Sequence, residues 1–197
     1  MTEKDVELFH PEKQIEVQRE IWANPATLGL MGFALTTMAT GLHNVGYWGA
    51  GPTLAMALAF GGTAQFFAGA IAFRKGAMFP GSAFCSYGAF WWSLFFMLFV
   101  LPMGGVKIDE PQLFGFFLMW TLFTLPFLMA SIKHGKLLFI LFLLLEIAFI
   151  LLDLVTLGIM SAVAAGWEIF ITGLLAWYIG AADLVNHDFG REVLPNP

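Results

Sequence analysis

Charged residues are scarce in this chain. Of its 197 residues, 12% are charged and 59% are hydrophobic, whereas soluble domains average about 25% charged and 45–50% apolar residues. A water-soluble globule and a disordered chain are therefore excluded. Basic residues are fewer than acidic ones, with 9 Lys and Arg against 14 Asp and Glu. Because no basic surface is available to hold phosphates, we expect no nucleic-acid partner.

Cysteine and metal-ligand patterns are nearly absent as well. The one cysteine, Cys85, cannot form an internal disulfide. The four histidines, His10, His43, His134 and His187, show none of the spacings that metal sites use. We therefore expect neither a metal nor a cofactor.

Long apolar runs are what the chain has in abundance. A hydrocarbon core about 30 Å thick requires roughly 20 apolar residues per spanning helix. Runs of this length, each bounded by turn residues or charges, occupy residues 28–47, 52–72, 82–101, 111–131, 136–157 and 165–184. The sequence thus predicts an all-α membrane protein with six transmembrane helices.

The Lys and Arg positions predict the orientation. Eight of the nine lie in an N-terminal tail (1–23), the second and fourth loops, and a C-terminal tail (186–197), leaving only Lys107 on the other side. Basic residues near spans stay cytoplasmic, so both termini are predicted to be cytoplasmic around a transmembrane domain at 24–185. No signal peptide is recognisable, and we expect the cell membrane. The N-terminal tail is interpreted as a short interfacial helix or a partly disordered segment.

Short motifs along the chain are more specific than its composition. They occupy residues 24–33 (NPATLGLMGF), 42–47 (LHNVGY), 61–69 (GGTAQFFAG), 86–91 (SYGAFW) and 189–195 (FGREVLP). In order and spacing these blocks resemble the acetate uptake transporter family, also called the succinate–acetate permeases. Thr27 stands where that family usually has a second proline.

The resemblance implies a small six-helix permease for acetate and related short carboxylates, succinate among them. It implies one pathway in each subunit and a ring of six subunits. Uptake in the family is described as proton-coupled, and channel-like anion conduction is also proposed. By position in the motifs, a hydrophobic constriction maps to Phe33 and Tyr87, and to Leu145 in a fifth helix that has no sharp motif.

One polar residue before helix one and one within helix two have two interpretations each. Asn24 before Pro25 is a favoured helix cap, and it either starts the helix only or lies beside a pore mouth, where a helix N-terminus favours anions. Gln65 is the one amide on a face of small residues spaced by four, which includes Gly61 and Gly69. It either bonds across a helix contact or offers its N–H₂ to a carboxylate.

Further candidates lie on helices one and three. Thr40 is expected to bond back to the preceding turn, while His43 and Asn44 either satisfy backbone groups or collect anions at the outer face. Tyr87, placed near the cytoplasmic end of helix three with Trp91 one turn on, belongs to an aromatic belt or to a gate. We assign the substrate pathway to Asn24, Thr40, His43, Asn44, Gln65, Tyr87 and Trp91.

Four acids fall within the predicted spans. Glu168 and Asp183 lie near opposite ends of helix six and are expected to reach interfacial water, whereas Glu146 is midway along helix five with Asp153 on the same face. An isolated carboxylate at the bilayer centre costs about 3 kcal/mol. Glu146 and Asp153 are interpreted as proton-linked or as interface residues. We favour an interface, because a negative charge on an anion's path is repulsive.

Other functions stay open at this point. Few charges in the spans would also suit a channel for a small neutral solute such as urea or ammonia. An intramembrane enzyme is disfavoured, because Ser86, Ser93, Ser131 and Ser161 lack a nucleophile context and the histidines lie at helix ends or in tails. A scaffold or sensor without flux is a third alternative.

Overall fold

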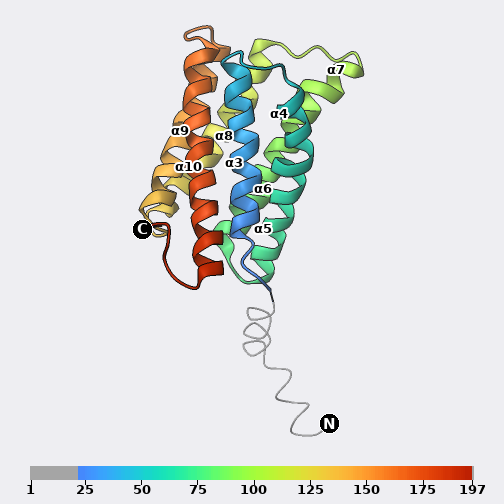
Figure 1. Ribbon diagram of the computed structural model, residues 1–197. Helices are drawn as coiled ribbons and strands as arrows, with labels where there is room; N and C mark the ends of the chain where they lie inside the picture. Colours follow the sequence, from blue (N-terminus) through green and yellow to red (C-terminus); the bar gives the residue numbers. More distant parts are fainter. Residues whose placement is uncertain (1–21, 197) are drawn as a thin grey trace, which may run out of the picture.

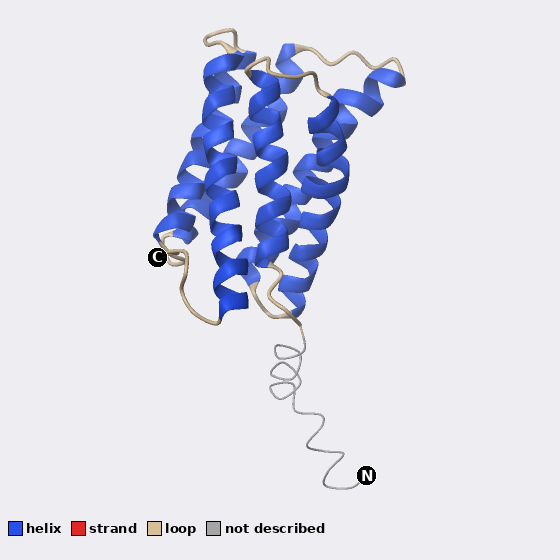
Figure 2. Cartoon of the chain, in the orientation of Figure 1, coloured by secondary structure: helices blue, strands red, loops and turns tan. Residues whose placement is uncertain are grey.

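The computed structural model describes residues 22–196, and within them the chain is helical without a strand (Figures 1 and 2). The predicted interfacial helix of the N-terminal tail lies outside the described residues, apart from its last positions. The helices run back and forth along one axis, and both ends of the described chain lie at the same end of the bundle (Figure 1).

Two of the long helices, Gly51–Arg74 and Met78–Met103, are contiguous runs of shorter elements. In chain order the described elements are α3 (Ala26–Asn44), α4 (Gly51–Met56), the π-helix η1 (Ala57–Ala64), α5 (Gln65–Arg74), α6 (Met78–Phe95), the π-helix η2 (Phe96–Val100), α7 (Leu101–Met103), α8 (Glu110–Ser131), α9 (Lys136–Thr156) and α10 (Ala162–Phe189). α3 packs against α10, α5 against α6, and α9 against both α8 and α10.

Five of the described helical segments have the length and apolar composition of a membrane span. They are Gly51–Arg74, Met78–Met103, Glu110–Ser131, Lys136–Thr156 and Ala162–Phe189. The 19-residue α3 is not among them. Its hydropathy is lowered by polar residues such as Thr36, which is fully buried. A helix enclosed by its neighbours has little contact with lipid, so it can carry such residues.

Two helices extend beyond their predicted limits. α6 begins at Met78 instead of residue 82, because Pro80 is tolerated in a first helical turn, where its missing N–H has no intrahelical partner. Tyr87 therefore lies more than two turns inside the helix and is only 2% exposed, which corrects its placement near the helix end. α10 spans Ala162–Phe189 instead of 165–184. It continues four residues past the predicted domain boundary at 185.

Glycines bring α3 and α10 into backbone contact. A Cβ on Gly173 would lie 2.8 Å from the carbonyl oxygen of Ala34, and one on Gly41 would lie 2.6 Å from the backbone N of Phe170. Neither position has space for a side chain. Small residues allow such close packing of membrane helices, where the hydrophobic effect supplies little driving force.

The π-helix η1 interrupts the second long helix beside the bundle interior. The Thr63 hydroxyl donates to the carbonyl oxygen of Leu58, five residues earlier, at 2.8 Å, and the Trp92 indole N–H donates to the Thr63 Oγ1 at 3.2 Å. π-Helical turns are rare in proteins, and those that occur often lie at functional sites. η1 ends at Ala64, so α5 begins at Gln65.

Candidate functional site

A first cavity enters the bundle from the end that holds both described termini. We call it the Asp183 cavity; it has a volume of about 320 Å³, and Asn24, His134 and Asp183 line it. These residues come from the start of α3, the α8–α9 loop and the last turns of α10. The His134 ring stacks on Phe79 at 4.2 Å between ring centroids.

Asn24 joins the start of α3 to α10 in this cavity. Its side-chain oxygen accepts the Ala26 N–H at 3.0 Å, and its amide donates to Asp183 Oδ2 at 3.0 Å. The first bond is of the helix-capping kind, although α3 begins at Ala26, with Pro25 in the capping position. The second holds Asp183 at the wall of the cavity in an exposed bond near the end of α10, where the side chain was expected to reach interfacial water.

Gln65 lies on the wall of the Asp183 cavity, at the start of α5. Its side chain is 1% exposed, and its carboxamide oxygen has no hydrogen-bond partner among residues 22–196. Leaving a buried polar atom unpaired costs about 1–3 kcal/mol. The unpaired oxygen can accept a hydrogen bond only from a solute that donates one, whereas the N–H₂ group of the same amide is the part that can donate to a carboxylate.

A second cavity enters from the opposite end. We call it the His43 cavity; its volume is about 360 Å³, and its wall includes Thr40, His43 and Asn44. The Thr40 hydroxyl donates to the Thr36 carbonyl four residues earlier at 2.9 Å, as predicted. His43 Nδ1 lies 3.2 Å from the Trp48 carbonyl oxygen. A carbonyl only accepts, so Nδ1 carries the hydrogen in this bond.

The His43 cavity holds two buried donors without partners. Trp91 Nε1 and Thr53 Oγ1 line the cavity on side chains 3% and 6% exposed, and neither has a hydrogen-bond partner among the described residues. Trp91 belongs to the predicted set. Thr53 does not, and a single threonine in the first turn of a helix gives no signal by which it could be recognised.

Phe33 and Leu145 line both cavities. They come from the middle of α3 and α9, and are 5% and 6% exposed. Tyr87 lines only the Asp183 cavity. Its ring lies edge-on to Phe33, with centroids 6.1 Å apart, and the ring of Trp91, which lines the His43 cavity, is 6.5 Å from Phe33. An apolar wall thus separates two cavities that both carry polar groups.

The Tyr87 hydroxyl is directed away from this wall, toward α8. Tyr87 Oη lies 2.9 Å from Thr124 Oγ1, and the Thr124 hydroxyl donates to the Trp120 carbonyl oxygen at 2.8 Å. A threonine hydroxyl has only one hydrogen, so Tyr87 is the donor to Thr124. The structure therefore assigns its O–H to a helix contact, while the gate hypothesis assigned it to a substrate carboxylate.

The acids of α9 line neither cavity. Asp153 Oδ2 accepts a hydrogen bond from the Thr121 hydroxyl of α8 at 2.9 Å. Glu146, on the same face of α9, is 5% exposed, and its Oε2 has no partner among the described residues. Both acids thus lie outside the walls of the two cavities, and Asp153 bonds across the contact between α8 and α9.

Glu168 also differs from expectation. It lies inside α10 because that helix starts at Ala162, and its Oε1 accepts from the Thr172 hydroxyl at 2.9 Å. The side chain is half-buried, and its Oε2 is buried without a partner in the described part of the chain. Within residues 22–196, no group of three His, Cys, Asp or Glu is placed to hold a metal ion.

Known proteins resemble this chain along most of its length. The succinate-acetate/proton symporter SatP of Escherichia coli (strain K12) is 40% identical over 177 residues, which cover 88% of this chain and 94% of that protein. Ammonia transport outward protein 2 of Saccharomyces cerevisiae is 34% identical over 170 residues, covering 80% of this chain and 60% of that protein.

The fold is also found among solved structures. The bacterial acetate channel SatP superposes with a TM-score of 0.85 at 38% sequence identity, covering 89% of this chain and 99% of the channel. A model of the GPR1/FUN34/yaaH family matches residues 7–195. With these matches and its apolar helices, the protein described here is a multi-pass membrane protein, and it belongs to the GPR1/FUN34/yaaH family.

Proposed function

We propose that this protein carries acetate and related short carboxylates across the cell membrane. The observation that carries the proposal is the pair of cavities from opposite ends that meet at Phe33 and Leu145. A substrate entering either cavity has only this apolar wall left to cross. The names of the relatives, a succinate-acetate/proton symporter and an acetate channel, support the choice of substrate.

The chemistry of the two sides suits a carboxylate with an apolar end. Trp91 and Thr53 offer unpaired N–H and O–H groups on one side of the wall. On the other side Gln65 can donate only through its N–H₂ group, since its unpaired oxygen is an acceptor. Neutral donors bind an anion without holding it as tightly as a fixed positive charge would, so the anion can leave again. The acetate methyl group can contact Phe33 while the carboxylate remains hydrogen-bonded.

The apolar wall also supplies selectivity. Phe33, Tyr87 and Leu145 form the constriction in this proposal, with the rings of Phe33 and Tyr87 in edge contact. An inorganic anion has no apolar end, so it must give up water without compensation at the wall. Acetate gives up less hydration there, propionate is tolerated for the same reason, and the argument says little about succinate. In this proposal the substrate passes four further polar residues before it reaches the wall: Asn24 in the Asp183 cavity, and Thr40, His43 and Asn44 in the His43 cavity.

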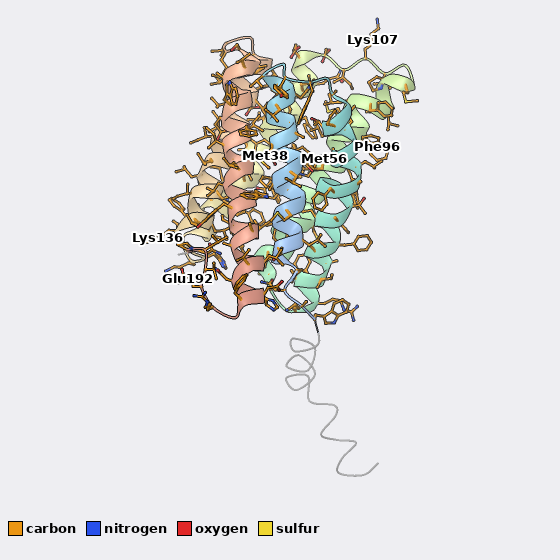
Figure 3. The ribbon with its side chains drawn as sticks, viewed as in Figure 1. Met38, Met56, Phe96, Lys107, Lys136 and Glu192 are labelled. Atoms are coloured by element: carbon orange, nitrogen blue, oxygen red, sulfur yellow. The ribbon has the colours of Figure 1, made fainter. Side chains whose placement is uncertain are left out.

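In the membrane we propose six spans with both termini in the cytoplasm. α3 is the sixth span, since it packs along α10, itself long and apolar enough to cross. An even number of spans is supported by the two described ends, which lie at one end of the bundle (Figure 1). Figure 3 shows Lys107 at the end opposite Lys136 and Glu192, in keeping with the positive-inside rule. A homohexamer is proposed from the family resemblance.

We assign Glu146 and Asp153 to helix packing, because they line neither cavity and Asp153 is bonded to α8. Proton linkage of uptake then involves no direct contact between these acids and the anion. Replacing Glu146 by Gln tests this assignment. If the dependence of acetate uptake on the proton gradient were lost in that variant, the acids would be part of the coupling.

Ammonia is the second candidate substrate, because one relative is named as an ammonia transport protein. Purified protein in liposomes separates the two. We expect uptake of labelled acetate, with propionate and succinate competing and with urea and methylammonium without effect. Absence of carboxylate flux, or flux of a neutral solute or methylammonium alone, would overturn the proposal.

A further inference from the structure

The chain reverses direction after α10. Gly190 adopts a left-handed conformation with φ of +62°, which ends the helix at Phe189 and is a common helix C-terminal geometry for glycine. Residues 191–196, which we call the C-terminal strap, then return toward the bundle, ending beside the start of α9 (Figure 1). The strap contains no helix.

Side chains of α10 hold the strap at two levels. Asn186 alone makes three hydrogen bonds to it: its Oδ1 accepts the N–H groups of Val193 and Leu194 at 2.7 and 2.9 Å, and its amide donates to the Leu194 carbonyl oxygen at 2.8 Å. The Tyr178 hydroxyl donates to the Pro195 carbonyl oxygen at 2.7 Å. At 1.5 Å per helical residue, the two anchors are about 12 Å apart along α10.

The strap ends in the mouth of the Asp183 cavity. Asn196, the residue after the second anchor, lines that cavity together with Asn24 and Asp183. Asp183 lies on α10 between Tyr178 and Asn186. Four hydrogen bonds thus hold the strap at the point where a substrate would enter or leave.

We propose that the C-terminal strap is a wall of the substrate mouth, in which Asn196 supplies a neutral polar surface to a passing carboxylate. Asn186 and Tyr178 are positioning residues that keep it there. The inference rests on the proposed function, because it makes the Asp183 cavity part of the path. The mouth already contains the Asp183 carboxylate, so neutrality at residue 196 limits the repulsion that an entering anion meets.

A charge at residue 196 tests this role. Asn196→Asp would add a negative charge several ångströms from a passing anion, and Coulomb's law at a wet surface gives about a fivefold reduction in the rate of acetate uptake at low ionic strength. Because salt screens exposed charges, the reduction should diminish in 0.5 M potassium sulfate. Asn196→Gln is the matched neutral variant, and any change in its rate of acetate uptake should be the same at low and at high salt.

Releasing the strap should remove this effect. When Asn196→Asp is made in an Asn186→Ala background, it should reduce the rate of acetate uptake by less than twofold, because residue 196 is no longer held in the mouth. Tyr178→Phe removes only one of the four bonds, so in that background the reduction in uptake caused by Asn196→Asp should lie between twofold and fivefold. An Asn196→Asp protein that transports at the wild-type rate, or a fivefold loss that persists unchanged in Asn186→Ala or in high salt, would overturn the proposal.

A cross-link tests the position of the strap without any flux measurement. In a Cys85→Ser background, Asn196→Cys and His134→Cys should be joined by a short bifunctional thiol reagent, since both positions line the mouth. The yield should fall in Asn186→Ala. No cross-link in the anchored protein would overturn the proposal, whereas a cross-link in a protein that moves no acetate would show that only the proposed function has failed.

Discussion

Phe33→Ala should open the wall between the two cavities. Phe33 is 5% exposed and borders both the 320 Å³ and the 360 Å³ cavity. Loss of the ring vacates on the order of 90 Å³, about three water volumes at roughly 30 Å³ each. The result is a hydrated connection where the wild type has an apolar one.

The size of the selectivity change follows from hydration. A hydrogen bond to a charged group contributes about 1.5–3 kcal/mol, and each 1.4 kcal/mol is a factor of ten. If chloride keeps one more water in the widened passage, its flux relative to acetate should rise about 10- to 150-fold. Acetate flux should change much less, because acetate already crosses with its carboxylate hydrogen-bonded.

The assay is paired chloride and labelled-acetate flux into proteoliposomes. Phe149→Ala is the matched control, since Phe149 is 3% exposed but lines the His43 cavity alone. Both variants lose an aromatic core residue, so the free energy of unfolding should fall by about 3–5 kcal/mol in both. Only Phe33→Ala should lose selectivity. A variant that still excludes chloride, or equal changes in both, would refute the placement of Phe33.

Four further predictions concern single groups. Tyr87→Phe should transport within twofold of the wild type, because its O–H is donated to Thr124; a tenfold loss in initial uptake would mean that the hydroxyl contacts substrate. Gln65→Leu should slow acetate uptake about tenfold, the effect of one lost hydrogen bond of about 1.5 kcal/mol to a charged group, and unchanged uptake would remove Gln65 from the path. Gly173→Ala should lower the thermal unfolding temperature in detergent, since its Cβ would lie 2.8 Å from a backbone oxygen, whereas Gly115→Ala, with open space around it, should not. Glu146→Gln should keep the wild-type pH dependence of uptake; a flattened profile would assign it to proton coupling.

The sequence could predict those features of the site that depend on local pattern. Apolar runs located the helices to within a few residues, and the order of motifs placed Phe33, Gln65 and Tyr87 on three of them. The apolar run at 28–47 predicted a span, whereas the matching helix α3 is not among the five candidate spans, since polar residues such as Thr36 interrupt its apolar sequence.

Other features depend on contacts between distant segments. The direction of the Tyr87 hydroxyl is decided by Thr124, 37 residues away on α8. Likewise Asn24 and Asp183 are 159 residues apart in the chain, so nothing near either residue predicts their bond. Hydrogen bonds of this kind follow from how the helices pack, which periodicity alone does not determine.

The strap and the π-helix were missed for different reasons. The motif at 189–195 was recognised, yet the three bonds that Asn186 makes to the strap depend on the reversal at Gly190. The π-helix η1 covers Gly61 and Gly62, within a run whose small residues at steps of four predict an ordinary helix. A pattern of four does not distinguish the two helix types over so few residues.

The central claim is that acetate passes between Phe33 and Leu145 from one cavity to the other. The most direct measurement uses Leu145→Cys in a Cys85→Ser background, with a small anionic methanethiosulfonate reagent added to proteoliposomes. Modification should block acetate uptake, reduction should restore it, and excess acetate should slow the labelling. A protein that is fully labelled at Leu145→Cys and still takes up acetate at the unmodified rate would contradict the path.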